Sequence, residues 1–212
     1  MDNSSTRSNN PYDSGWSRYY ERVLALPLIR QIRGSEERVL EELTALALRP
    51  EDRVLEIGPG TGRATVRLAR CAARLTVVEQ APAMVTLLRQ RLRREGLSNV
   101  TVVEGDFAAH SFPEPFDVVV LIGVLDYALE PAVFLRQAAA AARRELLFTV
   151  PHCGALAHAF RLGNRLRGVR IATFTPEQVV ACLPGFQVRV VETGLRTRWC
   201  RGLTLACRAV RG

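Results

Sequence analysis

Three glycines at alternate positions, in the stretch EIGPGTGRAT, are the residues of this chain best suited to bring backbone close to a ligand. Gly58, Gly60 and Gly62 follow a short hydrophobic run and precede a helical pattern. Glycine adopts positive φ angles and has no Cβ, so such a turn exposes backbone amides. A dinucleotide site would need glycine where this chain has Arg63, which argues against nicotinamide binding. Glu56, two residues ahead of the first glycine, repels a pyrophosphate and suits a ligand with an ammonium group.

Acidic residues also stand at the ends of the next two predicted strands. Glu79 ends the run LTVVE, where an acid can accept hydrogen bonds from both hydroxyls of a ribose. Asp106 ends the run VTVVEGD and is placed to accept from the exocyclic amine of an adenine. Phe107 beside it offers an aromatic edge and a backbone amide. Together with Glu56, these features describe a ligand with an amino-acid head, a ribose and an adenine.

The elements that position these residues alternate between strands and helices. The hydrophobic patterns predict strands at residues 53–58, 75–80, 100–106, 116–124, 145–150, 186–194 and 201–210. Helical patterns fill residues 62–72, 81–96, 131–144 and 175–185. This alternation predicts an α/β fold, a Rossmann-like and mostly parallel seven-stranded sheet with helices on both faces. The last two strands are expected to form an antiparallel hairpin. Ligands of such sheets bind beyond the carboxyl ends of the strands, where the glycine turn lies.

The domain prediction divides the chain near residue 50. Residues 1–50 are expected to form a disordered leader and an N-terminal helical cap, in which Pro27 divides the first helical pattern. Ser35 is expected to cap a second helix that ends before Pro50. Residues 51–212 form the main domain, with a substrate-covering insertion at residues 151–174. Thr175 and Gly96 are predicted helix caps within this domain.

The successive motifs VLEIGPGTG, LTVVEQAPAM, VTVVEGDF and FDVVVLIGVLDY resemble those of class I S-adenosylmethionine-dependent methyltransferases. The resemblance is close over about residues 50–150 and looser over FTPEQVVACLPGFQVRVVE. Within the family, the chain is most similar to the branch that methylates small molecules (methyltransferase domain types 11 and 25). The family implies S-adenosylmethionine as the cofactor and methyl transfer as the reaction.

The resemblance also implies a role for each motif residue. The backbone from Gly58 to Gly62 would hold the methionine part of the cofactor, and Glu56 would orient its amino group. Glu79 would take the ribose hydroxyls and Asp106 the adenine amine. The residues expected to flank the adenine ring or approach the sulfonium are Gln80, Phe107, Ile122 and Gly123.

The methyl acceptor is expected to be a small molecule. Nucleic-acid base methyltransferases carry an Asn/Asp-Pro-Pro-aromatic motif after the fourth strand, and this chain has LIGVLDYALEP there. Methyl transfer needs a positioned nucleophile, and it needs a base only when the acceptor is protonated. His152, after the fifth predicted strand, is the candidate base. The residues expected to contact the acceptor are Tyr12, Tyr19, Arg161 and Arg165.

The charge distribution suggests that the acceptor or another partner is anionic. The net charge is +8 and every basic residue is arginine. Residues 1–142 hold 17 Arg and 18 acids, whereas residues 143–212 hold 12 Arg and 3 acids, so the surplus lies in the last third. An anionic, lipophilic acceptor or peripheral contact with an anionic membrane surface would fit this asymmetry. Nucleic acid is not the expected partner.

Several other classes find no support in the sequence. No apolar run approaches the ~18 residues of a membrane span, and the N-terminus lacks the apolar region of a secretory signal. The five cysteines are scattered and form no CxxC pair, which argues against a disulfide framework and a metal site and favours the cytoplasm. An RNA-directed methyltransferase and a noncatalytic adenosylmethionine-binding protein are the alternatives. The acceptor atom and the oligomeric state stay open.

Overall fold

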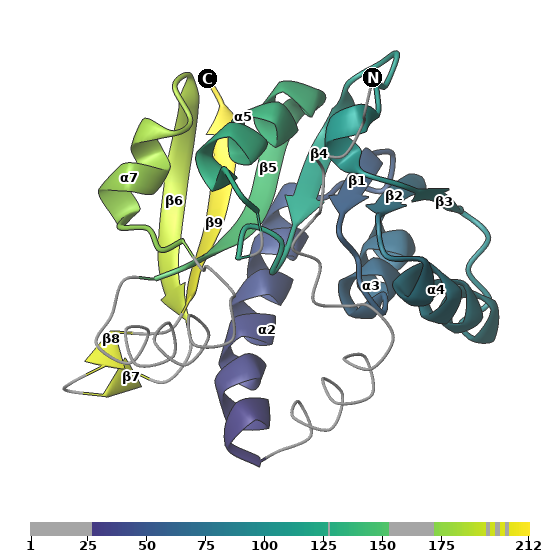
Figure 1. Cartoon of the computed structure of the whole chain (residues 1–212), viewed down its shortest axis with the longest axis horizontal. Coiled ribbons are helices and arrows are strands. Elements are labelled where there is room, and N and C mark those ends of the chain that lie inside the picture. Colours follow the sequence, from purple (N-terminus) through teal and green to yellow (C-terminus); the bar gives the residue numbers. More distant parts are fainter. Residues whose placement is uncertain (1–26, 127, 153–171, 194–195, 198–199, 202–203) are drawn as a thin grey trace, which may run out of the picture.

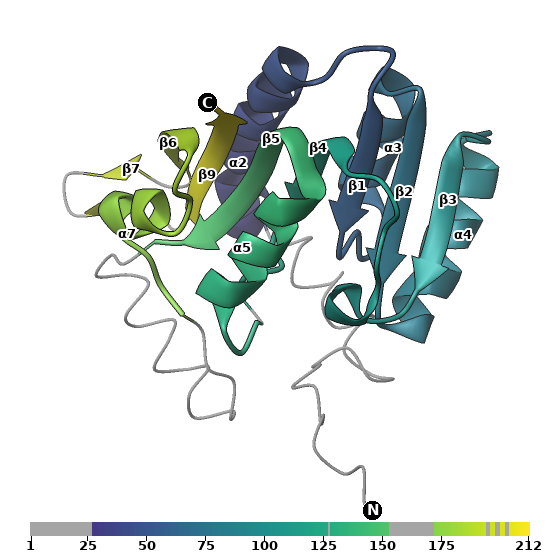
Figure 2. The ribbon, with the colours of Figure 1, turned by 90° about the horizontal axis from the view of Figure 1, so that it is seen from above.

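The computed structural model describes residues 27–126, 128–152, 172–193, 196–197, 200–201 and 204–212. These residues form three layers, with a central sheet between two layers of helices (Figures 1 and 2). No helix in these ranges is both long and apolar enough to cross a membrane.

Seven strands form the central sheet: β1 (Arg53–Ile57), β2 (Arg74–Glu79), β3 (Val100–Glu104), β4 (Phe116–Leu121), β5 (Ala142–Pro151), β6 (Phe186–Thr193) and β9 (Thr204–Arg211). Their order is β3-β2-β1-β4-β5-β9-β6, with β1 to β5 parallel and β9 antiparallel to both β5 and β6. In the chain segment that connects β6 to β9, the short strands β7 (Arg196–Thr197) and β8 (Cys200–Arg201) pair with each other and form a separate two-stranded sheet. The predicted Rossmann-like sheet and its antiparallel terminal hairpin are confirmed.

Helices cover both faces of this sheet (Figure 2). One face carries α2 (Pro27–Ala47), α3 (Arg63–Cys71) and α4 (Pro82–Arg94), and the other carries η1 (Phe107–Ala109), α5 (Pro131–Ala141) and α7 (Pro176–Ala181). Successive strand residues point to opposite faces, so Val54 packs in the cluster under α2 to α4 and Leu55 in the cluster under α5 and α7. Burial on both faces is what a parallel sheet requires.

Two helix ends follow the chemistry that the sequence predicts. Gly96, with φ +65°, ends α4, and the N–H of Leu97 donates to the oxygen of Leu92 at 3.1 Å in a Schellman arrangement. Thr175 caps α7 by accepting the N–H of Gln178 at 3.3 Å, and the Gln178 side chain accepts the N–H of Thr175 in return. Both predicted caps are confirmed.

The predicted start of the second N-terminal helix at Ser35 is wrong. Helix α2 begins at Pro27 and passes through Gly34 and Ser35 without a break. Proline fits the first turn because its missing N–H would have no helical partner there. Glycine inside a helix costs about 1 kcal/mol relative to alanine, and the burial of residues such as Leu40 and Leu43 against the sheet outweighs that cost.

Two buried carboxylates lie at the amino-terminal edge of the sheet, and each pairs with an arginine. Asp52 is 2% exposed and accepts from Arg144 at 2.7 and 3.0 Å; Glu145 is 4% exposed and accepts from Arg208 at 2.6 and 3.0 Å. The two guanidinium groups also donate to the backbone oxygens of the last two residues of α2, at 2.7 and 3.2 Å. This network therefore neutralises both acids and fixes the C-terminus of α2 to the sheet.

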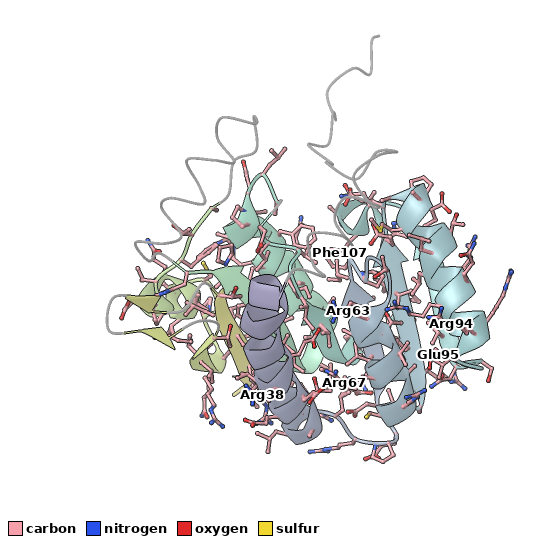
Figure 3. All side chains as sticks on the ribbon, turned by 90° about the horizontal axis from the view of Figure 1, so that it is seen from below. Arg38, Arg63, Arg67, Arg94, Glu95 and Phe107 are labelled. Carbon is pink, nitrogen blue, oxygen red and sulfur yellow. The ribbon has the colours of Figure 1, made fainter. Side chains whose placement is uncertain are left out.

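The exposed surface between α2 and α3 carries a second, weaker set of ion pairs. Arg67 on α3 lies 2.7 Å from Glu41 on α2, and Arg63 pairs with Glu37 one turn earlier on both helices. Figure 3 shows Arg63 and Arg67 along α3 beside α2. Exposed pairs of this kind contribute little stability, because water already solvates both charges.

Candidate ligand-binding site

The glycine turn joins β1 to α3 at the carboxyl edge of the sheet. Gly58, Gly60 and Gly62 have φ angles of +65°, +57° and +78°, a region that side chains disfavour. A Cβ on Gly58 would lie 2.7 Å from the Val124 side chain, and one on Gly62 would lie 2.4 Å from Leu88. A Cβ on Gly60 would meet no atom within 4 Å. The outer glycines thus allow close packing, whereas the middle one faces open space.

Glu56 lies under this turn, on β1, and is 3% exposed. Its Oε2 accepts a hydrogen bond of 2.6 Å from Oγ1 of Thr65, a buried residue of α3. Burial raises the pKa of Glu56 to about 7; the hydrogen bond from Thr65 opposes the rise, and nearby Glu79 adds to it. No arginine of the described residues pairs with Glu56. A ligand that carries a positive charge would offset the free-energy cost of burying the Glu56 carboxylate.

Glu79 ends β2 next to the same turn and is 7% exposed. Its Oε2 accepts the N–H of Gly60 at 3.0 Å, and its Oε1 accepts the N–H of Ala81 at 2.9 Å. A carboxylate has about four acceptor positions, so each oxygen keeps capacity for another donor. Within the described ranges, Glu79 forms no ion pair. The geometry therefore fixes Glu79 and leaves it able to accept two hydroxyl groups.

Asp106 lies beyond the end of β3, on the turn that opens η1. Its Oδ1 accepts the N–H of Ala108 at 3.0 Å, and the side chain is exposed. The preceding Gly105 donates its N–H to the backbone oxygen of Glu79 at 2.9 Å, which ties the ends of β2 and β3 together. The glycine turn, Glu79 and Asp106 thus occupy neighbouring strand ends, in the order β1, β2 and β3.

Phe107 and Gln80 differ in how much of each side chain is exposed for contact with a ligand. The Phe107 ring, labelled in Figure 3, is buried and packs on Phe112 and Phe134, with centroids 6.3 and 5.6 Å apart. Because the ring is only 7% exposed, little of it is left to contact a ligand. Gln80 is exposed directly after Glu79. Contact of either residue with an adenine stays a prediction.

The turn after β4 is fixed by a residue that the sequence did not point to. Gly123, with φ +68°, is exposed and donates its N–H to Oγ1 of Thr149 on β5 at 2.8 Å. In the sequence, the one indication of this contact is that Thr149 is a polar residue inside the otherwise apolar end of the run ELLFTV. His152 follows β5 at the same edge, is buried and pairs through a parallel bridge with Phe174. Its role as a base stays a prediction.

The four residues expected to contact the acceptor lie outside the described residues: Tyr12, Tyr19, Arg161 and Arg165. The structure thus brings together the predicted glycine turn, Glu56, Glu79 and Asp106, and it leaves the acceptor side of the site to proposal.

This sheet order, the glycine turn after β1 and the acids on β1, at the end of β2 and just after β3 are the features expected of the Rossmann-like fold of the class I methyltransferases. Residues 54–145 match the family described as "Methyltransferase domain", so this segment is a methyltransferase domain, as the resemblance of its motifs predicts. The match runs from β1 into β5 and contains the whole glycine turn, Glu79 and Asp106.

Solved structures of methyltransferases resemble the whole chain in fold. Magnesium protoporphyrin IX methyltransferase from Synechocystis PCC 6803, crystallised with S-adenosylhomocysteine, matches with a TM-score of 0.77 and 20% identity, over 95% of this chain and 96% of that one. The N-methyltransferase NodS from Bradyrhizobium japonicum WM9 matches with a TM-score of 0.64 and 21% identity, over 89% of this chain and 98% of that one. At such identities the likeness concerns the fold.

Curated relatives share a shorter segment at higher identity. A "probable ribosomal RNA small subunit methyltransferase A" from Methanosarcina acetivorans is 44% identical over 78 residues, which cover 37% of this chain and 28% of that protein. A protein-L-isoaspartate O-methyltransferase from Methanoregula boonei is 39% identical over 85 residues, which cover 40% of this chain and 37% of that protein. The chain therefore spans only about a third of the length of the curated relatives it matches.

Proposed function

We propose that this protein transfers a methyl group from S-adenosylmethionine to a small acceptor. The observation that carries the proposal is the pair of buried acids, Glu56 and Glu79, which flank an open glycine turn and have no basic partner among the described residues. Buried carboxylates are normally paired with a cation, whereas these two accept only three hydrogen bonds between them and keep free acceptor positions, so they fit a ligand that brings an ammonium group and hydroxyl groups.

The parts of S-adenosylmethionine fit these residues in order along the sheet edge. Its ammonium group would lie by Glu56, its methionine part along the turn around Gly60, and its ribose hydroxyls at Glu79. Asp106, whose Oδ1 already accepts one backbone N–H, would accept the adenine amine with its remaining capacity. Two solved neighbours, both magnesium protoporphyrin IX methyltransferases, contain S-adenosylhomocysteine or S-adenosylmethionine, which supports this choice of cofactor.

When bound, the cofactor would supply a sulfonium methyl carbon that an acceptor nucleophile can attack in line; the new bond to this carbon forms as its C–S bond breaks, and the sulfur leaves as a neutral thioether. The residues of this chain would contribute by orienting the cofactor and excluding water. We propose His152 as the group that takes a proton from the acceptor. His152 is buried at the edge where β5 ends. If it has this role, His152→Asn should lower kcat strongly and change KM little.

We further propose that the acceptor is anionic or lipophilic and is covered by residues 1–50 and the insertion at 151–174. The arginine surplus of residues 143–212 supports an anionic acceptor. So does the fold likeness to an enzyme that, by its name, methylates magnesium protoporphyrin IX. In this proposal Tyr12, Tyr19, Arg161 and Arg165 would contact the acceptor.

An RNA acceptor is the second candidate, because the relatives at 44% identity include ribosomal RNA methyltransferases. However, protein-L-isoaspartate methyltransferases match a share of the chain of similar size. Two acceptor classes that share one segment point to a segment that binds the cofactor and does not select the acceptor. The loop after β4 also lacks the Asn/Asp-Pro-Pro-aromatic motif of base methyltransferases.

The test combines binding with methyl transfer. Calorimetric titration with S-adenosylhomocysteine should show binding to the wild-type protein and strong weakening in Glu79→Ala and Asp106→Ala. Tritiated S-adenosylmethionine should then label a carboxylated porphyrin or another lipophilic acid, and should leave total RNA and a protein extract unlabelled. Labelling of RNA alone would favour the second candidate. Binding without transfer to any pool would favour a noncatalytic protein, and absence of binding would refute the proposal.

A further inference from the structure

His110 closes the turn that carries Asp106 from four residues further along the chain. Its Nδ1 lies 2.8 Å from the backbone oxygen of Asp106. A carbonyl oxygen can only accept, so Nδ1 carries the proton whether the imidazole is neutral or charged. The same oxygen also accepts the N–H of Ala109 at 3.1 Å. The imidazole is therefore the side chain that ties down the main chain of Asp106.

Gly105 provides the space that the ring occupies. Its φ is +143°, and a Cβ at this position would lie 2.7 Å from Cε1 of His110. Any larger residue would strain the backbone and push the ring away from the turn. Gly105 also donates its N–H to the backbone oxygen of Glu79. The His110 ring therefore packs against a residue that is hydrogen-bonded to the end of β2.

Aromatic packing fixes the orientation of the ring. His110 stacks on Phe112, with centroids 6.4 Å apart and an interplanar angle of 25°. Phe112 stacks in turn on Phe107, the buried residue that follows Asp106. The stack of His110, Phe112 and Phe107 thus holds the imidazole in the orientation in which Nδ1 meets the backbone oxygen of Asp106.

We propose that His110 is a positioning residue that holds Asp106 for recognition of the adenine amine. The inference rests on the proposed function, because it assumes that Asp106 meets an adenine. The ring acts through the main chain of Asp106 and does not itself touch the cofactor. Its loss would let the turn after β3 rotate, so the acid would no longer face the amine.

A purely space-filling role makes a different prediction. His110 is half-buried and lines a groove of about 450 Å³ together with Phe107, Phe112 and Gln137. A space filler would be replaced best by the residue of most similar size. A positioning residue would be replaced best by one that puts a donor where Nδ1 stands. Asparagine does so, whereas glutamine puts its donor where Nε2 stands.

The matched pair His110→Asn and His110→Gln tests the proposal. Calorimetric titration would compare S-adenosylhomocysteine with its inosine counterpart, in which an oxo group replaces the adenine amine. The wild-type protein should prefer the adenine compound. His110→Asn should keep this preference, whereas His110→Gln should bind S-adenosylhomocysteine about tenfold more weakly and lose most of the preference.

Thermal melting would check that both variants are folded, with His110→Ala as a third variant if glutamine destabilises the turn. An undiminished preference for adenine in the glutamine or alanine variant would overturn the proposal. If the wild-type protein itself failed to bind S-adenosylhomocysteine, the proposed function would fail instead, so the two failures are distinct.

Discussion

The two edges of the central sheet bury carboxylates in opposite ways. At the amino-terminal edge, Asp52 and Glu145 each receive two hydrogen bonds from a guanidinium group, and the same arginines cap α2. Charge is matched by charge, and the acids hold the layers together. This edge is complete without a ligand.

At the carboxyl edge, Glu56 and Glu79 are buried almost as deeply, yet the donors that they meet are one hydroxyl and two backbone N–H groups. Along the described part of the chain no arginine reaches them. The pKa of Glu56, raised to about 7 chiefly by burial, reflects this lack of a cation. This contrast between the two edges supports the proposal that a bound ligand completes the carboxyl edge.

The largest effect is expected at the amino-terminal edge. Arg144→Met removes the cation of Asp52 and leaves a buried charge, so the free energy of unfolding should fall by about 3 kcal/mol. Arg143→Met is the matched control, because Arg143 is exposed and makes one contact of 3.2 Å with Asp117; it should cost less than about 1 kcal/mol. Urea denaturation measures both. Equal losses would remove the distinction between paired burial and surface pairing.

At the carboxyl edge, Glu79→Gln should weaken S-adenosylhomocysteine binding about 100-fold. An amide has one oxygen, so it cannot accept from Gly60 and Ala81 together and still serve two hydroxyls. Glu104→Gln is the control, because Glu104 stands opposite Glu79 in the strand register and is exposed. Calorimetry on both variants checks this, and similar losses in the two would show that the effect is not local to Glu79.

The pH dependence of binding should report Glu56. With a pKa of about 7, Glu56 is mostly protonated at pH 6 and mostly ionised at pH 8, and the ammonium of the ligand favours the ionised form. Affinity for S-adenosylhomocysteine should therefore rise about tenfold from pH 6 to pH 8. Thr65→Val removes the hydrogen bond that lowers this pKa, so it should move the rise to higher pH. A flat profile between pH 6 and pH 8 would contradict this assignment.

The smallest effect is expected between α2 and α3. Arg67→Ala removes an exposed pair with Glu41, and the free energy of unfolding should change by less than about 0.5 kcal/mol. Thermal or urea denaturation at two salt concentrations measures it. A loss of the size expected for Arg144→Met would mean that the surface pairs, too, hold α2 in place.

The sequence predicted the sheet and the ligand edge because both leave local patterns. Short apolar strands alternate with helices, and Glu56, Glu79 and Asp106 stand at strand ends, where a single acid after an apolar run is easy to recognise. Parallel strands bring such ends to one edge, so these residues could be grouped without knowing any contact.

The partners of these residues could not be predicted in the same way. Arg144 meets Asp52 across 92 positions of the chain, and nothing local distinguishes it from the exposed Arg143 next to it. His110 gave no signal, because its contacts depend on the fold of one turn. The continuous helix through Ser35 was missed since burial against the sheet overrode a local capping preference.

The most direct test of the contrast exchanges one acid at each edge, Glu56→Gln and Glu145→Gln, at pH 8. The raised pKa means that Glu56 stabilises the fold at low pH and that this contribution is lost as pH rises from about 4.5 to 7. Removing the charge at pH 8 should therefore raise the free energy of unfolding by roughly 2–3 kcal/mol while weakening S-adenosylhomocysteine binding at least tenfold. Glu145→Gln should do the reverse, lowering stability and sparing affinity. If Glu56→Gln left both the stability and the affinity unchanged, the claim that this edge is built for a cationic ligand would be wrong.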